Sequence, residues 1–489
     1  MFPLGLLVLA AQSVSATTAA ASNLTAAVGW YASWHEPDVP LSSVLWSKYT
    51  HMTYAFACVL LPVYFASLQV TVYRTPTVDP KAISLAESDQ ELLPQFVAAA
   101  HKNVILLQGV KAGLSIGGWG GSQYFSSNLA SPTNRTSFVN SVTKLIQKYH
   151  LDLVDFDWEY PGMQGIGCNT ISDSDTQNLL LMLQELRASP IAANITLTAA
   201  TAVTPFPTTN TSLIPQIATV LDWIAPMVYD LSWNWTAGSP RIQRALPASP
   251  LDDSCYASTP DVTGDGLTGR GSARSAVEAW VAAGIPRSKI ALGVPGYGHS
   301  FNVNSTSAFL ATNATLLTPY PPYDTLNHSV GDKWDSTGGT DMCGKFWGPG
   351  GTWNFWALVN AGYLLANGTA APNVPYQWDA CSSTSYLYAA NHGVLVSYED
   401  PRSFAAKGAF VRANGLAGFS MWEVGGDPKG VLLEAILSAP TNSSLAVTAS
   451  ASAPTPTSVH GNNGANAQRV NTWTLPLCLL LGGTYWTLN

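Results

Sequence analysis

The chain has 489 residues, of which 47% are hydrophobic and only 11% are charged, and its formal net charge is −8. An ordinary globular domain carries about 25% charged residues, so this composition argues against a disordered chain, and the acidic balance argues against a general attraction to nucleic acid. The 17 Trp and 19 Tyr residues suit a neutral, amphipathic ligand such as a sugar, with a Trp-rich core as the alternative explanation.

The N-terminal end has the pattern of a secretory signal peptide. Residues 2–11 form an apolar run, and Val14-Ser15-Ala16 then supplies small residues for cleavage. A membrane anchor is the alternative, but the run is shorter than the ~20 residues that a spanning helix needs. We therefore expect residues 1–16 to be removed and the protein to be secreted.

Eight apolar runs of strand length recur along the chain, and several are followed by helical patterns. One such helix has Phe138, Val142 and Leu145 on one face. Strand followed by helix, eight times over, predicts an α/β fold with a (β/α)8 TIM barrel, and a doubly wound open sheet is the alternative. The runs cover residues 28–31, 51–57, 112–117, 153–159, 195–200, 223–229, 289–295 and 416–422.

The interval between the seventh and eighth runs is much longer than the others. It holds roughly 120 residues, is rich in Gly, Pro and aromatic residues, and is too long for a loop. We predict that residues 27–301 and 391–437 form the barrel and that residues 302–390 form a small inserted α+β domain.

The C-terminal end predicts attachment to the cell surface. Residues 439–463 include a run rich in Ser, Thr, Ala and Pro, as in an O-glycosylated stalk. Small residues at 463–465, a polar spacer and the mostly apolar tail 473–488 have the layout of a glycolipid-anchor signal. We expect residues 464–489 to be replaced by a lipid anchor, and a plain secreted protein is the alternative.

Cysteines and glycosylation sequons agree with export. Of six cysteines, we predict the pairs Cys168–Cys255 and Cys343–Cys381 and a free Cys58, although sequence alone leaves other pairings open. No CxxC pair or Cys/His cluster suggests zinc. Ten N-x-Ser/Thr sequons are present, a density expected of a secreted chain: Asn23, Asn134, Asn194, Asn210, Asn234, Asn304, Asn313, Asn327, Asn367 and Asn442.

Two motif matches are set aside. The sequence GLSIG at residues 113–117 fits the G-x-S-x-G elbow of serine hydrolases, but a Gly-rich loop follows it where that elbow needs a helix. Gly264, Gly266 and Gly269 fit a dinucleotide fingerprint, but a turn-like segment precedes them where a strand is required.

The fourth run, LDLVDFDWEY at residues 151–160, carries three carboxylates on one face. Alternate side chains of a strand share a face, so Asp155, Asp157 and Glu159 point into the barrel while Val154, Phe156 and Trp158 pack outward. Burying like charges together is costly and forces at least one carboxyl to keep its proton. Such a cluster separates pKa values, as acid catalysis requires, and a metal or ion-pair cluster is the alternative.

This run resembles the D-x-x-D-x-D-x-E signature of family 18 glycoside hydrolases, the chitinase family, with Asp152 in the first position. The resemblance covers roughly residues 27–437 and extends to three other motifs, Ser115-Ile116-Gly117-Gly118, Met227-Val228-Tyr229-Asp230 and Trp422. The inserted domain resembles the family's chitinase insertion domain. One departure is Trp30, which stands where the family usually has Tyr, so a hydroxyl that supports the inner aspartate is missing.

The resemblance implies a chitinase that cleaves chitin by a substrate-assisted, retaining mechanism. It makes Glu159 the acid, lets Asp157 hold the substrate's acetamido group, and lets Asp155 share a proton with Asp157, helped by Ser115. Tyr229 holds the acetamido oxygen. The remaining expected sugar contacts are Asp230, Met227, Trp422, Trp119, Phe56 and Trp30.

The expected ligand is chitin or chito-oligosaccharides, and we expect a monomer without metal or cofactor. Two alternatives remain. A chitin-binding lectin without activity shares the fold but typically lacks the acid. An endo-β-N-acetylglucosaminidase acting on N-glycans also shares the fold, but the insertion domain and the M-x-Y-D motif favour chitin.

Overall fold

The computed structural model describes residues 24–59, 83–105, 108–232, 244–254 and 271–441, together with Ser444. The predicted signal peptide and lipid-anchor signal, nearly all of the predicted stalk, Cys255, Cys478 and the sequons at Asn23, Asn234 and Asn442 lie outside these residues. No helix within the described ranges is long and apolar enough to span a membrane.

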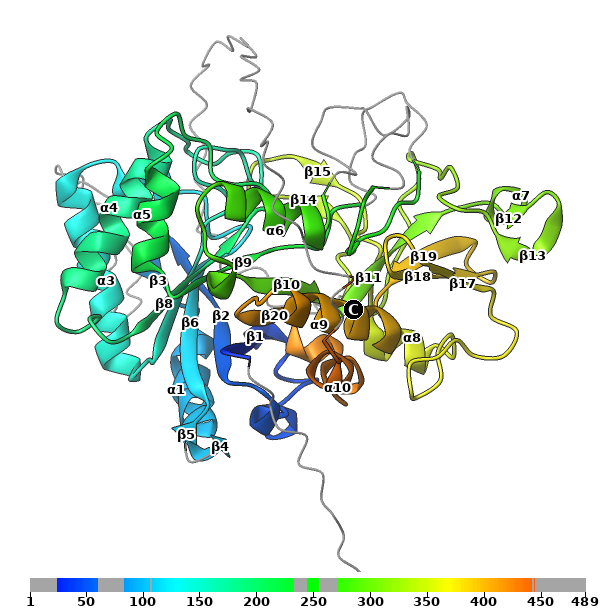
Figure 1. The fold of residues 1–489 in the computed structure, drawn as a ribbon, viewed down its shortest axis with the longest axis horizontal. Coiled ribbons are helices and arrows are strands. Elements are labelled where there is room, and N and C mark those ends of the chain that lie inside the picture. The colour runs from blue at the N-terminus through cyan, green and yellow to red at the C-terminus, as the bar shows by residue number, and fades with distance from the viewer. Residues whose placement is uncertain are drawn as a thin grey trace, which may run out of the picture.

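Eight parallel strands form the barrel, and all eight predicted runs contribute one strand each (Figure 1). In spatial order the strands run β10-β20-β1-β2-β6-β7-β8-β9, and a parallel bridge between Ile224 and Ile290 joins the two ends. The strands are β1 (Ala26–Ala32), β2 (His51–Val59), β6 (Lys111–Gly117), β7 (Leu153–Asp157), β8 (Thr196–Thr201), β9 (Trp223–Pro226), β10 (Ala291–Pro295) and β20 (Gly418–Trp422). The prediction of a TIM barrel is therefore confirmed.

Two strands end earlier than their apolar runs. The strand β7 ends at Asp157, because the N–H of Glu159 bonds to Ser122 Oγ where a strand would use a neighbouring carbonyl. The strand β9 ends at Pro226, because the N–H of Val228 turns back to the carbonyl of Pro226 over 2.9 Å and does not bond to a neighbouring strand. In both places the residues that follow the strand carry the chemistry.

Amphipathic helices cover the outside of the barrel (Figure 1). The predicted helix around Phe138 is α3 (Pro132–Tyr149), which starts with Pro at its first turn and with Ser131 Oγ accepting from the N–H of Asn134. The other barrel helices are α1 (Glu87–Lys102), α2 (Phe125–Leu129), α4 (Asp175–Ala188), α5 (Leu213–Val220), α6 (Ala273–Ala282), α9 (Pro401–Ala413) and α10 (Val431–Ser438).

The outward side chains of β7 explain the packing of this layer. Val154 and Phe156 are buried in the main core, and Trp158, the residue just after the strand, stacks on Phe125 of α2 with ring centroids 5.0 Å apart. The inward side chains Asp155 and Asp157 are also buried. The alternation predicted from the sequence is therefore present. Shorter strands on this side of the molecule are β3 (Ile83–Ser84), β4 (Val104–Ile105) and β5 (Gln108–Gly109).

An antiparallel sheet lies beside the barrel (Figure 1), and the chain between β10 and β20 forms it. Its order is β16-β11-β19-β18-β17, and it takes in residues 297–301 and 394–398 beyond the predicted insertion. The sheet strands are β11 (Tyr297–Asn302), β16 (Thr352–Asn354), β17 (Tyr376–Asp379), β18 (Thr384–Ala389) and β19 (Val394–Tyr398). Smaller elements are α7 (Ser305–Ala308), β12 (Phe309–Leu310), β13 (Asn313–Leu317), β14 (Gly339–Thr340), β15 (Phe346–Trp347) and α8 (Phe355–Asn360).

The predicted disulfides are wrong. Cys168 bonds to Cys343, with their Cα atoms 5.5 Å apart, which excludes both proposed pairs. Cys58, predicted to be free, is disulfide-bonded, as is Cys381, and no cysteine in the described ranges is a free thiol. Cys168 and Cys343 are 175 residues apart in the chain. Only the folded arrangement brings Cys343, in the hairpin of β14 and β15, against Cys168 in the segment after β7.

Candidate active site

Asp155 lies at the centre of a hydrogen-bonded row across three strands. The register pairs it with Ser115 on β6 and with Thr198 on β8. Ser115 Oγ donates to Asp155 Oδ2 over 2.7 Å, and Thr198 Oγ1 donates to Oδ1 over 2.6 Å. The indole N–H of Trp30 also donates to Oδ2, over 3.1 Å. The indole N–H at position 30 therefore supplies the hydrogen bond that the sequence analysis expected to be missing without a Tyr hydroxyl.

The second aspartate is less well satisfied. Asp157 is 5% exposed, and its Oδ1 has no hydrogen-bond partner among the residues that the structure describes. Burial first, and then the charges of Glu159 and Asp155, raise the pKa of Asp157 well above its usual range. Burial also raises the pKa of Asp155, but its three donors act in the opposite direction. The proton of this aspartate pair is thus favoured on Asp157.

Glu159 lies two residues beyond Asp157, the last residue of β7. Its N–H donates to Ser122 Oγ over 2.9 Å, and its carbonyl accepts from Asn169 Nδ2 over 2.8 Å. Burial raises the pKa of the Glu159 carboxyl to about 8. The hydrogen bond from Tyr160 lowers this pKa, and the charge of Asp230 raises it. A carboxyl that keeps its proton near neutral pH is suited to act as a general acid.

The segment after β9 brings Tyr229 and Asp230 toward these carboxyls. Tyr229 is buried, and burial, followed by nearby carboxylates including Asp157, raises its pKa well above the usual range, so its hydroxyl stays a donor. Asp230 has a positive φ of 56° and accepts hydrogen bonds from Tyr297 Oη over 2.9 Å and His299 Nε2 over 2.6 Å. Both donors come from β11, so the insertion supplies part of this site.

Aromatic rings line the neighbouring strand ends. Trp422 stacks on Phe56, with centroids 5.4 Å apart, and contacts the edge of Trp30 at 6.3 Å. Trp34, which the sequence analysis missed, lies 6.1 Å from both Trp422 and Phe56. Met227 and Trp422 both pack against a small buried cluster that includes Trp30. This surface offers flat apolar faces beside the carboxyls, as sugar rings require.

The structure thus brings together nearly all the predicted site residues at one end of the barrel. Trp119 lies in the segment after β6, half-buried, two residues beyond Gly117, which pairs with Asp157. The sequence analysis missed several residues that contact the predicted ones. The alternating threonines of β8 were a signal for Thr198, but no local pattern marked the others: Trp34, Ser122, Tyr160, Asn169, Tyr297 and His299.

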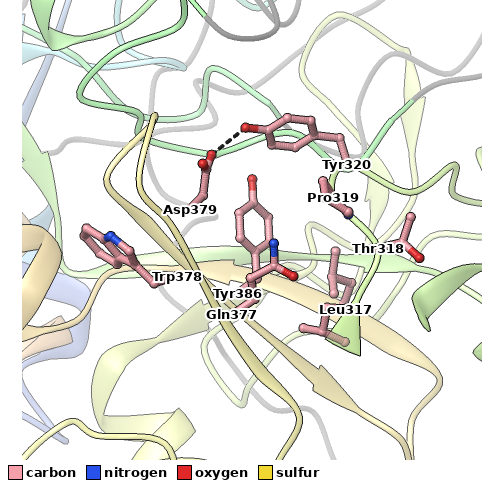
Figure 2. A pocket seen from close by; sticks show the side chains of 9 residues that line it. Leu317, Thr318, Pro319, Tyr320, Gln377, Trp378, Asp379 and Tyr386 are labelled. Carbon is pink, nitrogen blue, oxygen red and sulfur yellow. Dashed lines mark hydrogen bonds between the residues drawn. The ribbon is translucent and has the colours of Figure 1, made fainter. Parts of the chain in front are cut away.

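A separate cavity of about 110 Å³ lies in the insertion, between residues 317–320 and the sheet (Figure 2). Its aromatic wall includes Tyr320, whose hydroxyl donates to Asp379 Oδ2 over 2.5 Å. Ser382 Oγ donates to the same carboxylate. Because Asp379 is already satisfied, the cavity does not repeat the chemistry of the carboxyl cluster. Within the described ranges, no group of three or more His, Cys, Asp or Glu side chains is arranged to hold a metal ion.

The chain belongs to glycoside hydrolase family 18. The model of this family, described as glycosyl hydrolases family 18, matches residues 26–427, a range that contains all eight barrel strands and the insertion. The resemblance inferred from four sequence motifs is therefore confirmed. The sheet beside the barrel is typical of the family's insertion domain.

Several chitinases and chitinase-like proteins are similar to the chain. It is 40% identical over 435 residues to a chitinase-like effector of Moniliophthora roreri, covering 88% of this chain and 96% of that protein. It is 30% identical over 324 residues to Chitinase A1 of Niallia circulans, covering 65% of this chain and 41% of that protein.

Solved structures show the same fold. A chitinase from Rhizomucor miehei matches with a TM-score of 0.66 and 28% identity, over 84% of this chain and 98% of that chain. A family 18 chitinase from Cycas revoluta in complex with (GlcNAc)3 matches with a TM-score of 0.58 and 20% identity, over 84% of this chain and 98% of that chain. At that identity the likeness concerns the fold alone.

Proposed function

We propose that the protein is a chitinase that hydrolyses β-1,4 linkages between N-acetylglucosamine residues with retention of configuration. The observation that carries this proposal is the buried carboxyl series Asp155, Asp157 and Glu159, which runs along β7 and just past its end. Glu159 keeps its proton near neutral pH, and Asp157 offers a buried oxygen that no described residue satisfies. A substrate with an acetamido group requires an acid to protonate the glycosidic oxygen and an acceptor for its acetamido N–H, and these two carboxyls supply both.

The reaction begins with proton transfer from Glu159 to the glycosidic oxygen, while the bond from that oxygen to C1 breaks. The carbonyl oxygen of the substrate's own acetamido group bonds to C1 and forms an oxazolinium ion. Water then attacks C1, the Glu159 carboxylate takes its proton, and the acetamido group is released. Two inversions at C1 give net retention, and Glu159 ends in its protonated form.

Asp157 stabilises the intermediate. Its free oxygen accepts the acetamido N–H, and negative charge on its carboxyl offsets the positive charge that grows on the oxazolinium ion. Asp155 shares the proton of the pair, so that Asp157 can take up this charge as the reaction proceeds. Trp30, Ser115 and Thr198 hold Asp155 in place for this exchange.

The remaining residues orient the sugar. The buried hydroxyl of Tyr229 donates to the acetamido oxygen, and Asp230 accepts from a sugar hydroxyl. Trp422 stacks beneath the ring, with Phe56 and Met227 beside it. A sugar without an acetamido group lacks the nucleophile, so selectivity for N-acetylglucosamine follows from the mechanism.

The test is cleavage of chitin pentamer by the secreted protein and by its Glu159→Gln variant, which keeps the shape of the side chain but cannot give up a proton. We expect the wild type to release short oligomers and the variant to lose about 10²- to 10⁴-fold of the rate. Asp157→Asn, measured in parallel, separates loss of the acid from loss of acetamido positioning.

The alternatives predict different outcomes of the same experiment. Binding of the pentamer without cleavage would indicate a lectin, and the Moniliophthora roreri relative is described as a chitinase-like effector and not as a chitinase. Release of glycans from an N-glycosylated protein, without action on chitin, would indicate an endo-β-N-acetylglucosaminidase.

We also propose that the protein is secreted and held at the cell surface by a C-terminal lipid. The Cys168–Cys343 disulfide supports an oxidising compartment, and the apolar C-terminal tail supports the anchor. Phospholipase C should release the protein from intact cells. Protein found only in the medium before treatment would contradict the anchor.

A further inference from the structure

The segment that follows the proposed acid Glu159 folds back onto the main chain of Glu159. Asn169 is 6% exposed, and its Nδ2 donates to the carbonyl of Glu159 over 2.8 Å. Gly165 passes so close to the same carbonyl that an added Cβ would lie 2.1 Å from its oxygen. With Ser122 Oγ bonded to the N–H of Glu159, both sides of this residue's backbone are held.

The folded-back segment, residues 162–169, is closed by its own side chains. Gln164 Oε1 accepts from the N–H of Asn169 over 3.2 Å, and Gln164 Nε2 donates to the carbonyl of Asn169 over 3.0 Å. At the other end, the N–H of Gly162 donates to Asp175 Oδ2 over 3.1 Å. Asp175 is fully buried at the start of α4, so the segment rests on a fixed support.

A covalent bond ties this segment to the insertion. Cys168, next to Asn169, forms the disulfide with Cys343 in the hairpin of β14 and β15. Gln123 Nε2 donates to Cys168 Sγ over 3.1 Å. In Figure 1 this hairpin lies well apart from β17, β18 and β19, so the disulfide joins the segment to an outlying part of the insertion.

We infer that Asn169, anchored by the Cys168–Cys343 disulfide, is a positioning residue for the acid Glu159, so that the insertion holds the acid at the angle that proton transfer requires. This inference rests on the proposed function. The side chain of Asn169 donates to the main-chain carbonyl of Glu159 and not to its carboxyl, which is left for the substrate. The hydrogen bond and the disulfide act in series, because Cys168 and Asn169 are adjacent.

Loss of the Asn169 hydrogen bond or of the Cys168–Cys343 disulfide should therefore affect proton transfer more than substrate binding. A displacement of about 1 Å in a reacting group can reduce the rate about 10²-fold. We expect kcat to fall 10- to 100-fold, while KM changes less than about threefold, because Asp157, Tyr229 and Trp422 keep their places.

A moved Glu159 should also meet more water. Burial is the main reason for the raised pKa of its carboxyl, so added water should lower that pKa by at least one unit. The titratable groups that act on Glu159, or that its charge acts on, would remain in the variants: Asp157, Tyr160, Tyr229, Asp230 and Tyr297.

The experiment compares the full-length protein with two variants, Asn169→Leu, which keeps the volume but removes the donor, and Cys168→Ser with Cys343→Ser. The matched control is Asn103→Leu, because Asn103 Nδ2 donates to the carbonyl of Ala99 in the same way at the end of α1. For each protein, kcat and KM are measured on chitin pentamer across pH. The Glu159 carboxyl is titrated separately by infrared difference against Glu159→Gln in the same background.

The inference predicts a lower kcat, an unchanged KM and a lower Glu159 pKa in both variants, and none of these changes in Asn103→Leu. A fall in melting temperature alone, with kcat and the titration unchanged, would overturn it and indicate a purely structural role. If one variant fails to fold, the other decides. If the wild type does not cleave chitin, the proposed function fails, but the infrared titration still decides whether Asn169 positions Glu159.

Discussion

The pH dependence of cleavage should respond in opposite directions to two changes beside Glu159. Tyr160 donates a hydrogen bond that lowers the pKa of this carboxyl, and Asp230 carries a charge that raises it. A hydrogen bond to a charged group contributes about 1.5–3 kcal/mol, or roughly one to two pH units. Tyr160→Phe should therefore raise the pKa from about 8 toward ~9, and Asp230→Asn should lower it.

The consequence for the rate follows from the fraction of protonated acid. With a pKa of about 8, only roughly 9% of Glu159 keeps its proton at pH 9, whereas a pKa of ~9 leaves about half protonated. Relative to its own maximum, Tyr160→Phe should be about fivefold more active than the wild type at pH 9. Asp230→Asn should lose activity at a lower pH than the wild type does.

The assay is kcat/KM on chitin pentamer from pH 5 to 10, with each curve normalised to its maximum, because both variants also lose contacts that support the absolute rate. Glu159→Gln supplies the background rate. Alkaline limbs that stay together in all three proteins, or that move in the same direction, would refute the assignment of the alkaline limb to Glu159.

Three further predictions concern other parts of the chain. Trp30→Phe removes one of three donors to Asp155, so kcat should fall by about tenfold or more, as measured on chitin pentamer. Burial lowers the pKa of His51 from 6.5 to about 3. Below pH 6.5 the unfolded chain therefore binds a proton on His51 that the folded protein does not bind, and the free energy of unfolding should fall by about 1.4 kcal/mol per pH unit. Urea unfolding measures this slope, and His51→Gln should lack it. Peptide mapping should find Asn134, whose Nδ2 is held by the carbonyl of Ser127, unmodified. It should find glycans on the exposed sequons whose Oδ1 accepts the hydroxyl of the second residue after it: Asn210, Asn304, Asn313 and Asn367.

Each of these predictions has an outcome that contradicts it. Trp30→Phe with unchanged kcat would show that Ser115 and Thr198 suffice for Asp155. Equal pH slopes of stability in the wild type and His51→Gln would mean that His51 titrates normally in the folded state. A glycan on Asn134 would contradict the view that the side-chain geometry of the sequon decides which sites the fold tolerates.

Much of the barrel could be predicted from the sequence, because short apolar runs and period-two alternation indicate strands. The same alternation placed Asp155 and Asp157 on the inner face of β7 and Phe156 on the outer face, where the structure has them. Strand ends were less predictable. Glu159 leaves the strand because Ser122, from a loop elsewhere in the sequence, takes its N–H.

The contacts between distant segments could not be predicted, because they depend on strand register and on the path of loops. Thr198 reaches Asp155 only because β8 pairs with β7 in one register. From the sequence, Trp30 was expected to leave Asp155 without one hydrogen-bond donor, because it replaces a Tyr hydroxyl. The sequence does not show that the indole N–H of Trp30 points at Asp155 and takes that place.

The sequence by itself therefore determined the order of strands, the carboxyl series and the family, all of which are local patterns along the chain. Only the tertiary structure decided which groups surround those carboxyls. Cys168 pairs with Cys343 and not with the predicted Cys255, because disulfide formation depends on the distance between folded segments. The same distances bring Asn169 to Glu159 and Tyr297 to Asp230, and no pattern of residues in one segment can encode them.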